Sequence, residues 1–229
     1  MPELLTYELD GRVAKVTLDD GKVNAFSIPM LKELHAAFDQ AESDEAILLL
    51  TGREKYFSAG FDLKVFTEHP EDIVEMLNLG ATLCERALAF PTPVVTACTG
   101  HALAAGTFLP LCADARIGVQ GAWKYGLNEV RIGLTVPLFV VELARQRLTP
   151  AEFSRAVVTA KTYSPDEAVD AGFLDEVVDA GELSERSQAV ALDLAGLDPA
   201  AHRATKLRAR EAAMTAVRQG IETELEANR

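Results

Sequence analysis

Two stretches of small residues could bring backbone N–H groups close to a negatively charged ligand atom. The first, residues 58–62, follows the apolar run 46–50, and the second, residues 104–106, follows the apolar run 94–98. A charge-free apolar run predicts a buried strand, and small residues after it let a ligand approach the backbone. Free N–H groups at the start of a helix attract negative charge. A helix packed tightly against a sheet also needs small residues, so each stretch alone is open to both interpretations.

The candidate acid or base is Glu129, which ends the segment Tyr125-Gly126-Leu127-Asn128-Glu129. A glutamate in a loop is ordinarily exposed and inert, so its position alone gives it no role.

In three segments the sequence resembles the crotonase (enoyl-CoA hydratase/isomerase) superfamily, with the family's order and spacing. These segments are Tyr56-Phe57-Ser58-Ala59-Gly60-Phe61-Asp62-Leu63-Lys64, then Gly100-His101-Ala102-Leu103-Ala104-Ala105-Gly106, and the glutamate segment. The resemblance extends from Leu4 to about Lys206. It implies an α/β fold, a spiral of β-β-α units whose terminal helices pack subunits into trimers or dimers of trimers.

The resemblance also implies that two backbone N–H groups bind the thioester oxygen of an acyl-CoA. Carried over position by position, the donors are the N–H groups of Phe61 and Ala105, and Glu129 is the catalytic glutamate. Removing a proton beside a thioester carbonyl moves charge onto its oxygen, and each fixed donor can stabilise that charge by roughly 3–4 kcal/mol. The same resemblance implies the substrate-binding residues Lys22, Ser58, Ala59, Gly60, Asp62, Lys64, Ala104, Gly106 and Phe108.

Two departures from the family pattern bear on the reaction. Phe108 stands where the family's hydratases have their first glutamate, and Ala105 stands where the family usually has glycine. Hydration needs one group to deprotonate water and another to deliver a proton, whereas moving a double bond from position 3 to position 2 needs one base. The segment around Glu129 most resembles the enoyl-CoA isomerase branch. We therefore expect an acyl-CoA isomerase; a weak hydratase and a non-catalytic acyl-CoA binding protein remain the alternatives.

Composition excludes several other classes of function. The chain has 229 residues, 48% of them hydrophobic, and a formal charge of −13. This charge argues against a nucleic acid or an anionic membrane as partner, since both require a basic surface. CoA is itself anionic, so a CoA site must be a local group of basic residues on an otherwise acidic chain. Lys22, Arg53, Lys55 and Lys64 could form it, or could be solvated surface charges.

The spacing of the cysteines and histidines predicts a chain without a metal or a redox cofactor. Cys84, Cys98 and Cys112 lie in apolar surroundings without paired spacing, which predicts reduced core thiols. The four histidines lack metal-ligand spacing, and no dinucleotide fingerprint occurs. Neither a signal sequence nor a membrane-spanning stretch is evident, so we expect a cytoplasmic protein. The only small molecule expected is the acyl-CoA substrate, with CoA as part of it.

Local signals predict the elements that position these residues. Asp10-Gly11 predicts a hairpin, Ser27 caps a helix, residues 71–90 form another, and the stretch after Gly100 is a tight turn that enters a helix. Capping boxes begin at Thr149 and Ser164. Residues 1–180 are expected to form the spiral core and 181–229 a helical region. Its basic segment 202–210 could touch CoA phosphates of a neighbouring subunit or be a solvated helix face.

Overall fold

A six-stranded sheet forms the centre of the fold. The computed structural model describes residues 3–227, so residues 1–2 and 228–229 of the two predicted regions lie outside the described part. The sheet has the order β1-β2-β4-β7-β9-β11, with β1 antiparallel to β2 and every other neighbouring pair parallel. Its strands are β1 Leu5–Asp10, β2 Val13–Leu18, β4 Ile47–Thr51, β7 Val94–Cys98, β9 Ala115–Val119 and β11 Glu176–Val178. The predicted hairpin is confirmed, with Gly11 at a φ of 57° in its turn.

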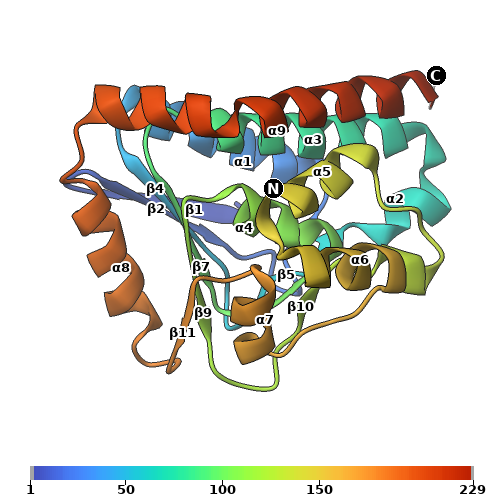
Figure 1. Ribbon diagram of the computed structural model, residues 1–229, viewed down its shortest axis with the longest axis horizontal. Helices are drawn as coiled ribbons and strands as arrows, with labels where there is room; N and C mark the ends of the chain where they lie inside the picture. The colour runs from blue at the N-terminus through green and yellow to red at the C-terminus, as the bar shows by residue number, and fades with distance from the viewer. Residues whose placement is uncertain (1–2, 228–229) are drawn as a thin grey trace.

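Two smaller sheets lie beside the ends of these strands. One has the order β10-β8-β5, made of β5 Lys55–Ser58, β8 Gly100–Leu103 and β10 Tyr125–Gly126; the other pairs β3 Ala25–Phe26 with β6 Gly60–Phe61. The chain passes from the six-stranded sheet to the three-stranded sheet three times, from β4 to β5, from β7 to β8 and from β9 to β10. The predicted α/β architecture is confirmed, and Figure 1 shows helices on both sides of the sheets.

One element of the second small-residue stretch differs from the prediction. The expectation was a tight turn directly after Gly100, but β8 comes first, because residues 100–103 pair with both β5 and β10. The turn follows as a 3-10 helix, η2, over Ala104–Thr107, and α4 then begins at Phe108. Both partners of β8 are distant in the chain, so no local signal marks it as a strand.

Two of the three predicted capping residues cap a helix. Their bounds are α1 Ile28–Ser43, α2 Leu63–Glu68, η1 Pro70–Asp72, α3 Ile73–Ala89, α4 Phe108–Cys112, η3 Glu129–Ile132, α5 Leu138–Arg147, α6 Pro150–Thr159, α7 Pro165–Ala171, α8 Leu183–Leu194 and α9 Pro199–Ala227. Ser27 caps α1, and Ser164 forms the predicted capping box of α7. The box predicted at Thr149 is wrong: its side chain makes no capping bond, and the Glu152 carboxylate instead accepts from the Tyr163 hydroxyl at 2.9 Å.

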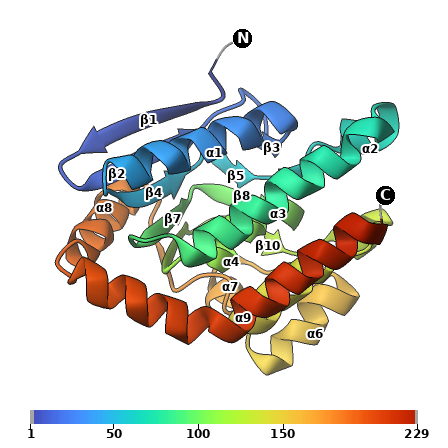
Figure 2. The ribbon, with the colours of Figure 1, turned by 90° about the horizontal axis from the view of Figure 1, so that it is seen from above.

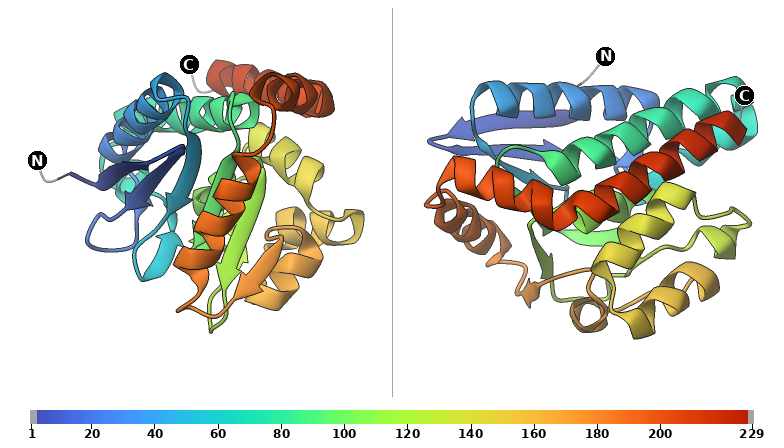
Figure 3. Two further views of the ribbon diagram at one scale, coloured as in Figure 1. Left: turned by 90° about the vertical axis from the view of Figure 1, so that its left-hand side faces the viewer. Right: turned by 45° about the horizontal axis from the view of Figure 1, so that its top comes forward.

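The two faces of the large sheet bury different sets of side chains. On one face, residues such as Val13, Ile47 and Val95 pack against Leu183 and Ala191 of α8. On the other face a larger core packs under the remaining helices, where α1, α3 and α9 run side by side (Figures 2 and 3). All three cysteines are buried, as predicted. Within residues 3–227, no helix combines the length and apolar character needed to cross a membrane.

The basic segment of α9 is an internal anchor. Asp114, just before β9, accepts from Lys206 Nζ at 2.6 Å, from Arg210 Nη2 at 2.8 Å and from the Val94 N–H at 2.8 Å. Burial lowers the pKa of Lys206, and the nearby Asp114 carboxylate opposes that shift. The side chain of Lys206 is only 3% exposed. Lys206 and Arg210 therefore fasten α9 to the sheet, a role that neither interpretation of this segment included.

Candidate active site

The first small-residue turn is held between two short strands. Gly60 and Phe61 form β6, which pairs in parallel with β3, and the Asp62 N–H donates to the Phe26 carbonyl at 3.4 Å. Asp62 then caps α2 by accepting from the Lys64 N–H at 3.0 Å. The N–H of Phe61 thus lies in a segment that is tied at both of its ends, as a fixed donor requires.

The second turn is interlocked with the first. A Cβ added to Gly60 would lie 2.9 Å from the Leu103 carbonyl oxygen and 3.1 Å from the Ala105 nitrogen, and one added to Gly106 would lie 2.1 Å from the Ser58 carbonyl oxygen. Both glycines are therefore required by close approach of the two backbones. Ala104 adopts a left-handed φ of 47°, a conformation that costs a non-glycine residue about 1 kcal/mol. This packing brings the predicted donors, Phe61 and Ala105, to the same side of the molecule.

A column of aromatic rings forms one wall beside these turns. The rings of Phe61 and Phe108 meet edge to face with centroids 5.7 Å apart, and Phe108 meets Phe139 of α5 in the same way at 5.6 Å. Gly80 of α3 leaves room for the Phe61 ring, because an added Cβ would lie 2.6 Å from it. Phe108 therefore contributes an apolar surface at the place where the resemblance puts a hydratase glutamate.

Glu129 opens the 3-10 helix η3, and its carboxyl group is buried. The side chain is 6% exposed, and its Oε2 atom has no hydrogen-bond partner among residues 3–227. Burial raises the pKa of Glu129 from 4.5 to about 7, because removal from water disfavours the charged carboxylate. A carboxyl group with this pKa can both take up and release a proton near neutral pH, which suits it to acid-base chemistry.

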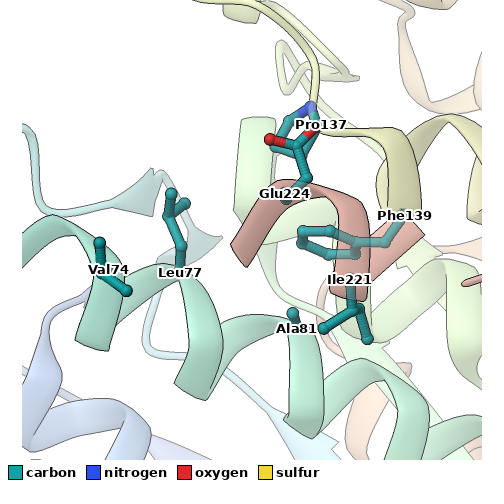
Figure 4. A pocket seen from close by; sticks show the side chains of 7 residues that line it. All are labelled: Val74, Leu77, Ala81, Pro137, Phe139, Ile221 and Glu224. Carbon is teal, nitrogen blue, oxygen red and sulfur yellow. The ribbon is translucent and has the colours of Figure 1, made fainter. Parts of the chain in front are cut away.

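The turns, the Phe61 and Phe108 rings of the aromatic wall and Glu129 line one cavity of about 390 Å³. Its lining is mostly apolar: Ala59, Phe61, Leu63, Phe66, Ile73, Leu77, Leu103, Ala104, Ala105, Phe108, Asn128, Glu129, Ile132, Leu134, Thr135, Pro137 and Glu224. A void of about 10 Å³ adjoins it between α3, α5 and α9, and Leu77, Pro137 and Glu224 line both spaces (Figure 4). The cavity thus combines two turns with candidate donors, one buried carboxyl group of raised pKa and an apolar wall.

Six of the predicted site residues line this cavity: Ala59, Phe61, Ala104, Ala105, Phe108 and Glu129. The other six do not: Lys22, Ser58, Gly60, Asp62, Lys64 and Gly106. The two glycines and Asp62 shape the turns instead, and Ser58 is wholly buried with its hydroxyl bonded to backbone groups. The side chains of Lys22 and Lys64 are exposed, so their contact with CoA phosphates stays a prediction.

Three polar residues of the lining, Asn128, Thr135 and Glu224, were missed by the sequence analysis. Asn128 has a buried Oδ1 atom without a partner in the described part of the chain, directly before Glu129. Its place next to the candidate base was the signal that could have drawn attention to it. Glu224 comes from α9, where its carboxylate accepts from the Leu138 N–H at 2.9 Å. Nothing in the sequence around Glu224 indicates that its side chain lines a cavity whose other lining residues fall between 59 and 137.

Among residues 3–227, one group of side chains has the proximity that a metal ion requires. Ligand atoms of His69, Glu71 and Asp72 all lie within 4.8 Å of one another, at the surface around η1. None of these residues lines the cavity.

Comparison with known proteins finds related sequences and solved structures of the same fold. A family model described as enoyl-CoA hydratase/isomerase matches residues 8–228. A probable enoyl-CoA hydratase of Bacillus subtilis is 30% identical over 200 residues, which cover 85% of this chain and 77% of that protein. An enoyl-CoA hydratase/isomerase family protein from Pseudomonas syringae superposes with a TM-score of 0.95 at 44% identity, over 97% of each chain. An enoyl-CoA isomerase of Mycobacterium tuberculosis gives a TM-score of 0.94 at 41% identity, over 99% of each chain.

Proposed function

The chain belongs to the enoyl-CoA hydratase/isomerase family, and we propose that it moves a double bond from position 3 to position 2 of an enoyl-CoA. Solved structures that are both 41% identical to this chain carry the names hydratase and isomerase, so the choice between these reactions rests on the cavity. The observation that carries the proposal is the pair Phe108 and Glu129. Phe108 is an apolar residue that is 2% exposed, and Glu129 is a buried carboxyl group with a raised pKa.

The reaction needs one base and a site for negative charge. The Glu129 carboxylate removes a proton from carbon 2 of the substrate, and the electron pair moves into the thioester, which becomes a dienolate. The N–H groups of Phe61 and Ala105 donate to the thioester oxygen that carries this charge. Glu129 then returns the proton to carbon 4, so that the double bond lies between carbons 2 and 3. One carboxyl group thus serves as base and then as acid.

The aromatic wall and the apolar lining support this chemistry in two ways. They exclude water from the dienolate, which strengthens the interaction of its charge with the fixed donors. They also keep the pKa of Glu129 near the pH at which the reaction runs. A water molecule that attacks carbon 3 would need a second group for its proton, and the Phe108 ring cannot supply one.

Glu224 favours the second candidate, a hydratase, because it is another carboxylate in the same lining. Its carboxylate is engaged by the Leu138 N–H at the start of α5 and lies beside Pro137 (Figure 4). This bond holds the Glu224 carboxylate at the first residue of α5, which supports a structural role. If Glu224 served hydration, Glu224→Gln would lower the hydration rate and leave isomerisation as it is in the wild type.

The test is to assay 3-enoyl-CoA isomerisation and 2-enoyl-CoA hydration side by side with the wild type and Glu129→Gln. The amide keeps the size of the carboxylate but cannot accept the carbon-2 proton, so kcat of isomerisation should fall by about 10²–10⁴-fold. The Kd for a saturated acyl-CoA should stay within a few-fold, measured by calorimetry. Efficient hydration by the wild type would contradict the isomerase proposal, and tight binding without any turnover would replace it with an acyl-CoA binding protein.

The proposal includes turnover without metal or nicotinamide, as a cytoplasmic homotrimer or hexamer. Dialysis against a chelator should leave isomerisation unchanged, and light scattering should give three or six times the chain mass of 24.7 kDa. Exposed apolar side chains support assembly: Val130, Ile132 and Val158 are between 45% and 66% exposed, on η3 and α6, which contact each other. A monomer at micromolar concentration would contradict this part of the proposal.

A further inference from the structure

A buried asparagine lies directly beneath the first donor turn. Asn24 is 0% exposed and has a left-handed φ of 53°, which is uncommon for a residue other than glycine. Its side-chain amide nitrogen lies 3.0 Å from the carbonyl oxygen of Leu18, 3.2 Å from that of Tyr56 and 3.1 Å from that of Phe57. Asn24 therefore joins the end of β2 to β5, the strand that leads into the turn.

Ser58 continues this connection to the donor itself. Its hydroxyl donates to the Asn24 carbonyl oxygen at 2.6 Å and accepts from the Gly60 N–H at 3.1 Å. The next residue is Phe61, whose N–H is the first proposed donor. The amide on the other side of Phe61, that of Asp62, is bonded to Phe26. The amides before and after the donor are thus fixed, one of them by the Ser58 hydroxyl.

The same serine adjoins the second donor turn. The Ser58 carbonyl oxygen is packed so closely against Gly106 that a Cβ on that glycine would lie 2.1 Å away. Gly106 follows Ala105, whose N–H is the second proposed donor. A shift of Ser58 would therefore displace the backbone of both turns, because the Ser58 carbonyl oxygen is in close contact with Gly106.

We infer that Ser58 is a positioning residue for the two-donor site, with Asn24 as its support. This inference rests on the proposed function and adds a residue that acts on the reaction without touching the substrate. Its hydroxyl is fully buried and has one bond as donor and one as acceptor, so it contacts backbone groups rather than the cavity. The donors are backbone groups, which no side-chain substitution removes. Ser58 is thus the side chain through which their alignment can be changed.

The physical reason is that such donors act by being aligned before the reaction begins. Stabilisation of a developing oxyanion depends on fixed orientation, and a displacement of about 1 Å can cost on the order of 10²-fold in rate. Ser58→Ala removes the acceptor of the Gly60 N–H and the donor to Asn24 while keeping a small buried side chain. We expect kcat of isomerisation to fall by about 10- to 100-fold, with KM changed by less than about threefold.

A spectroscopic readout separates this role from a general loss of structure. Acetoacetyl-CoA loses a carbon-2 proton to become an enolate that absorbs in the near ultraviolet, and Glu129 can accept this proton when the ligand is bound. Titrating the bound ligand with pH measures how strongly the donors stabilise the enolate. In Ser58→Ala the fraction of enolate at a given pH should correspond to a roughly 10-fold or greater loss of stabilisation. The Kd for butyryl-CoA, which forms no such enolate under these conditions, should stay within about threefold.

Ser187→Ala is the matched control. Ser187 is also a buried serine, 2% exposed, whose hydroxyl donates to the Ser184 carbonyl at 3.2 Å in α8, on the other face of the large sheet. Its substitution should leave enolate formation and kcat unchanged. Ser58→Cys is the second variant, since a thiol keeps a weak donor and acceptor, and should lie between the wild type and Ser58→Ala.

The outcomes separate the inference from the function on which it rests. If folded Ser58→Ala, or Ser58→Cys where the alanine variant does not fold, matches the wild type in enolate formation and kcat, Ser58 has no positioning role. Equal losses in Ser187→Ala would also overturn the inference, because they would show a general effect of stability. If the wild type itself neither forms the enolate nor isomerises 3-enoyl-CoA, the proposed function fails, and the positioning role fails with it.

Discussion

Glu129→Gln should make the protein more stable at high pH while it removes activity. The folded state raises the pKa of this carboxyl from 4.5 to about 7. Between these two pH values the unfolded chain has released the proton and the folded chain still holds it, so wild-type stability falls as pH rises. The full penalty is about 2.5 pKa units, or about 3.4 kcal/mol, and it is absent below the unfolded pKa.

The change with pH is a sharper test than the stability at any single pH. By the same relation the penalty is about 1.4 kcal/mol at pH 5.5 and close to its full value at pH 8.5. The difference in unfolding free energy between variant and wild type should therefore grow by about 2 kcal/mol over this range. Any cost of burying the glutamine amide is independent of pH and cancels from this change.

Thermal unfolding followed by circular dichroism measures this difference. For a chain of this size, about 2 kcal/mol corresponds to a change of roughly 4–8 °C in the Tm difference between the two proteins. All other titrating groups are common to both and cancel. Tm curves of wild type and variant that run parallel from pH 5.5 to 8.5 would refute the argument, since they would show that Glu129 ionises at its ordinary pKa.

Three further results are expected. The kcat/KM of isomerisation should fall tenfold per pH unit below about 7, because only the Glu129 carboxylate accepts the carbon-2 proton; a midpoint near 4.5 in the pH-rate profile would contradict this. Phe108→Glu should raise the hydration rate of 2-enoyl-CoA and lower stability, since it places a carboxyl group where the side chain is 2% exposed; unchanged hydration in a folded variant would count against the assignment. Asp114→Asn should lower the free energy of unfolding by about 3–5 kcal/mol, because Lys206 and Arg210 lose their buried carboxylate; a urea titration with an unchanged midpoint would disprove this.

Local sequence signals predicted the parts of the fold that depend on neighbouring residues. The Asp10-Gly11 turn, the Ser27 cap and the Ser164 capping box each involve residues within a few positions of one another, and all three are present. The resemblance to the crotonase superfamily supplied Phe61, Ala105 and Glu129, and all three line one cavity. Such features need no knowledge of which strands pair.

The features that were missed depend on contacts distant in the chain. The segment 100–103 is a strand because β5 and β10 lie on either side of it. The Glu152 carboxylate accepts a hydrogen bond from the Tyr163 hydroxyl instead of forming the predicted capping box. The sequence analysis did not single out Asn24, whose side-chain amide donates to the carbonyls of residues 56 and 57. In each case a partner that periodicity cannot locate decides the local structure.

The anchoring of α9 has a consequence for the order in which this site is completed during synthesis. The donors and Glu129 have all been synthesised once residue 129 is made, but Glu224 of the cavity wall follows 95 residues later. At about 5–20 residues per second, this interval is roughly 5–19 seconds. During it the nascent chain can hold Asp114 without Lys206 or Arg210, and its cavity lacks the wall that α9 supplies. Because Glu224 lies on the last helix, the part of the cavity wall that α9 supplies is completed only at the end of synthesis.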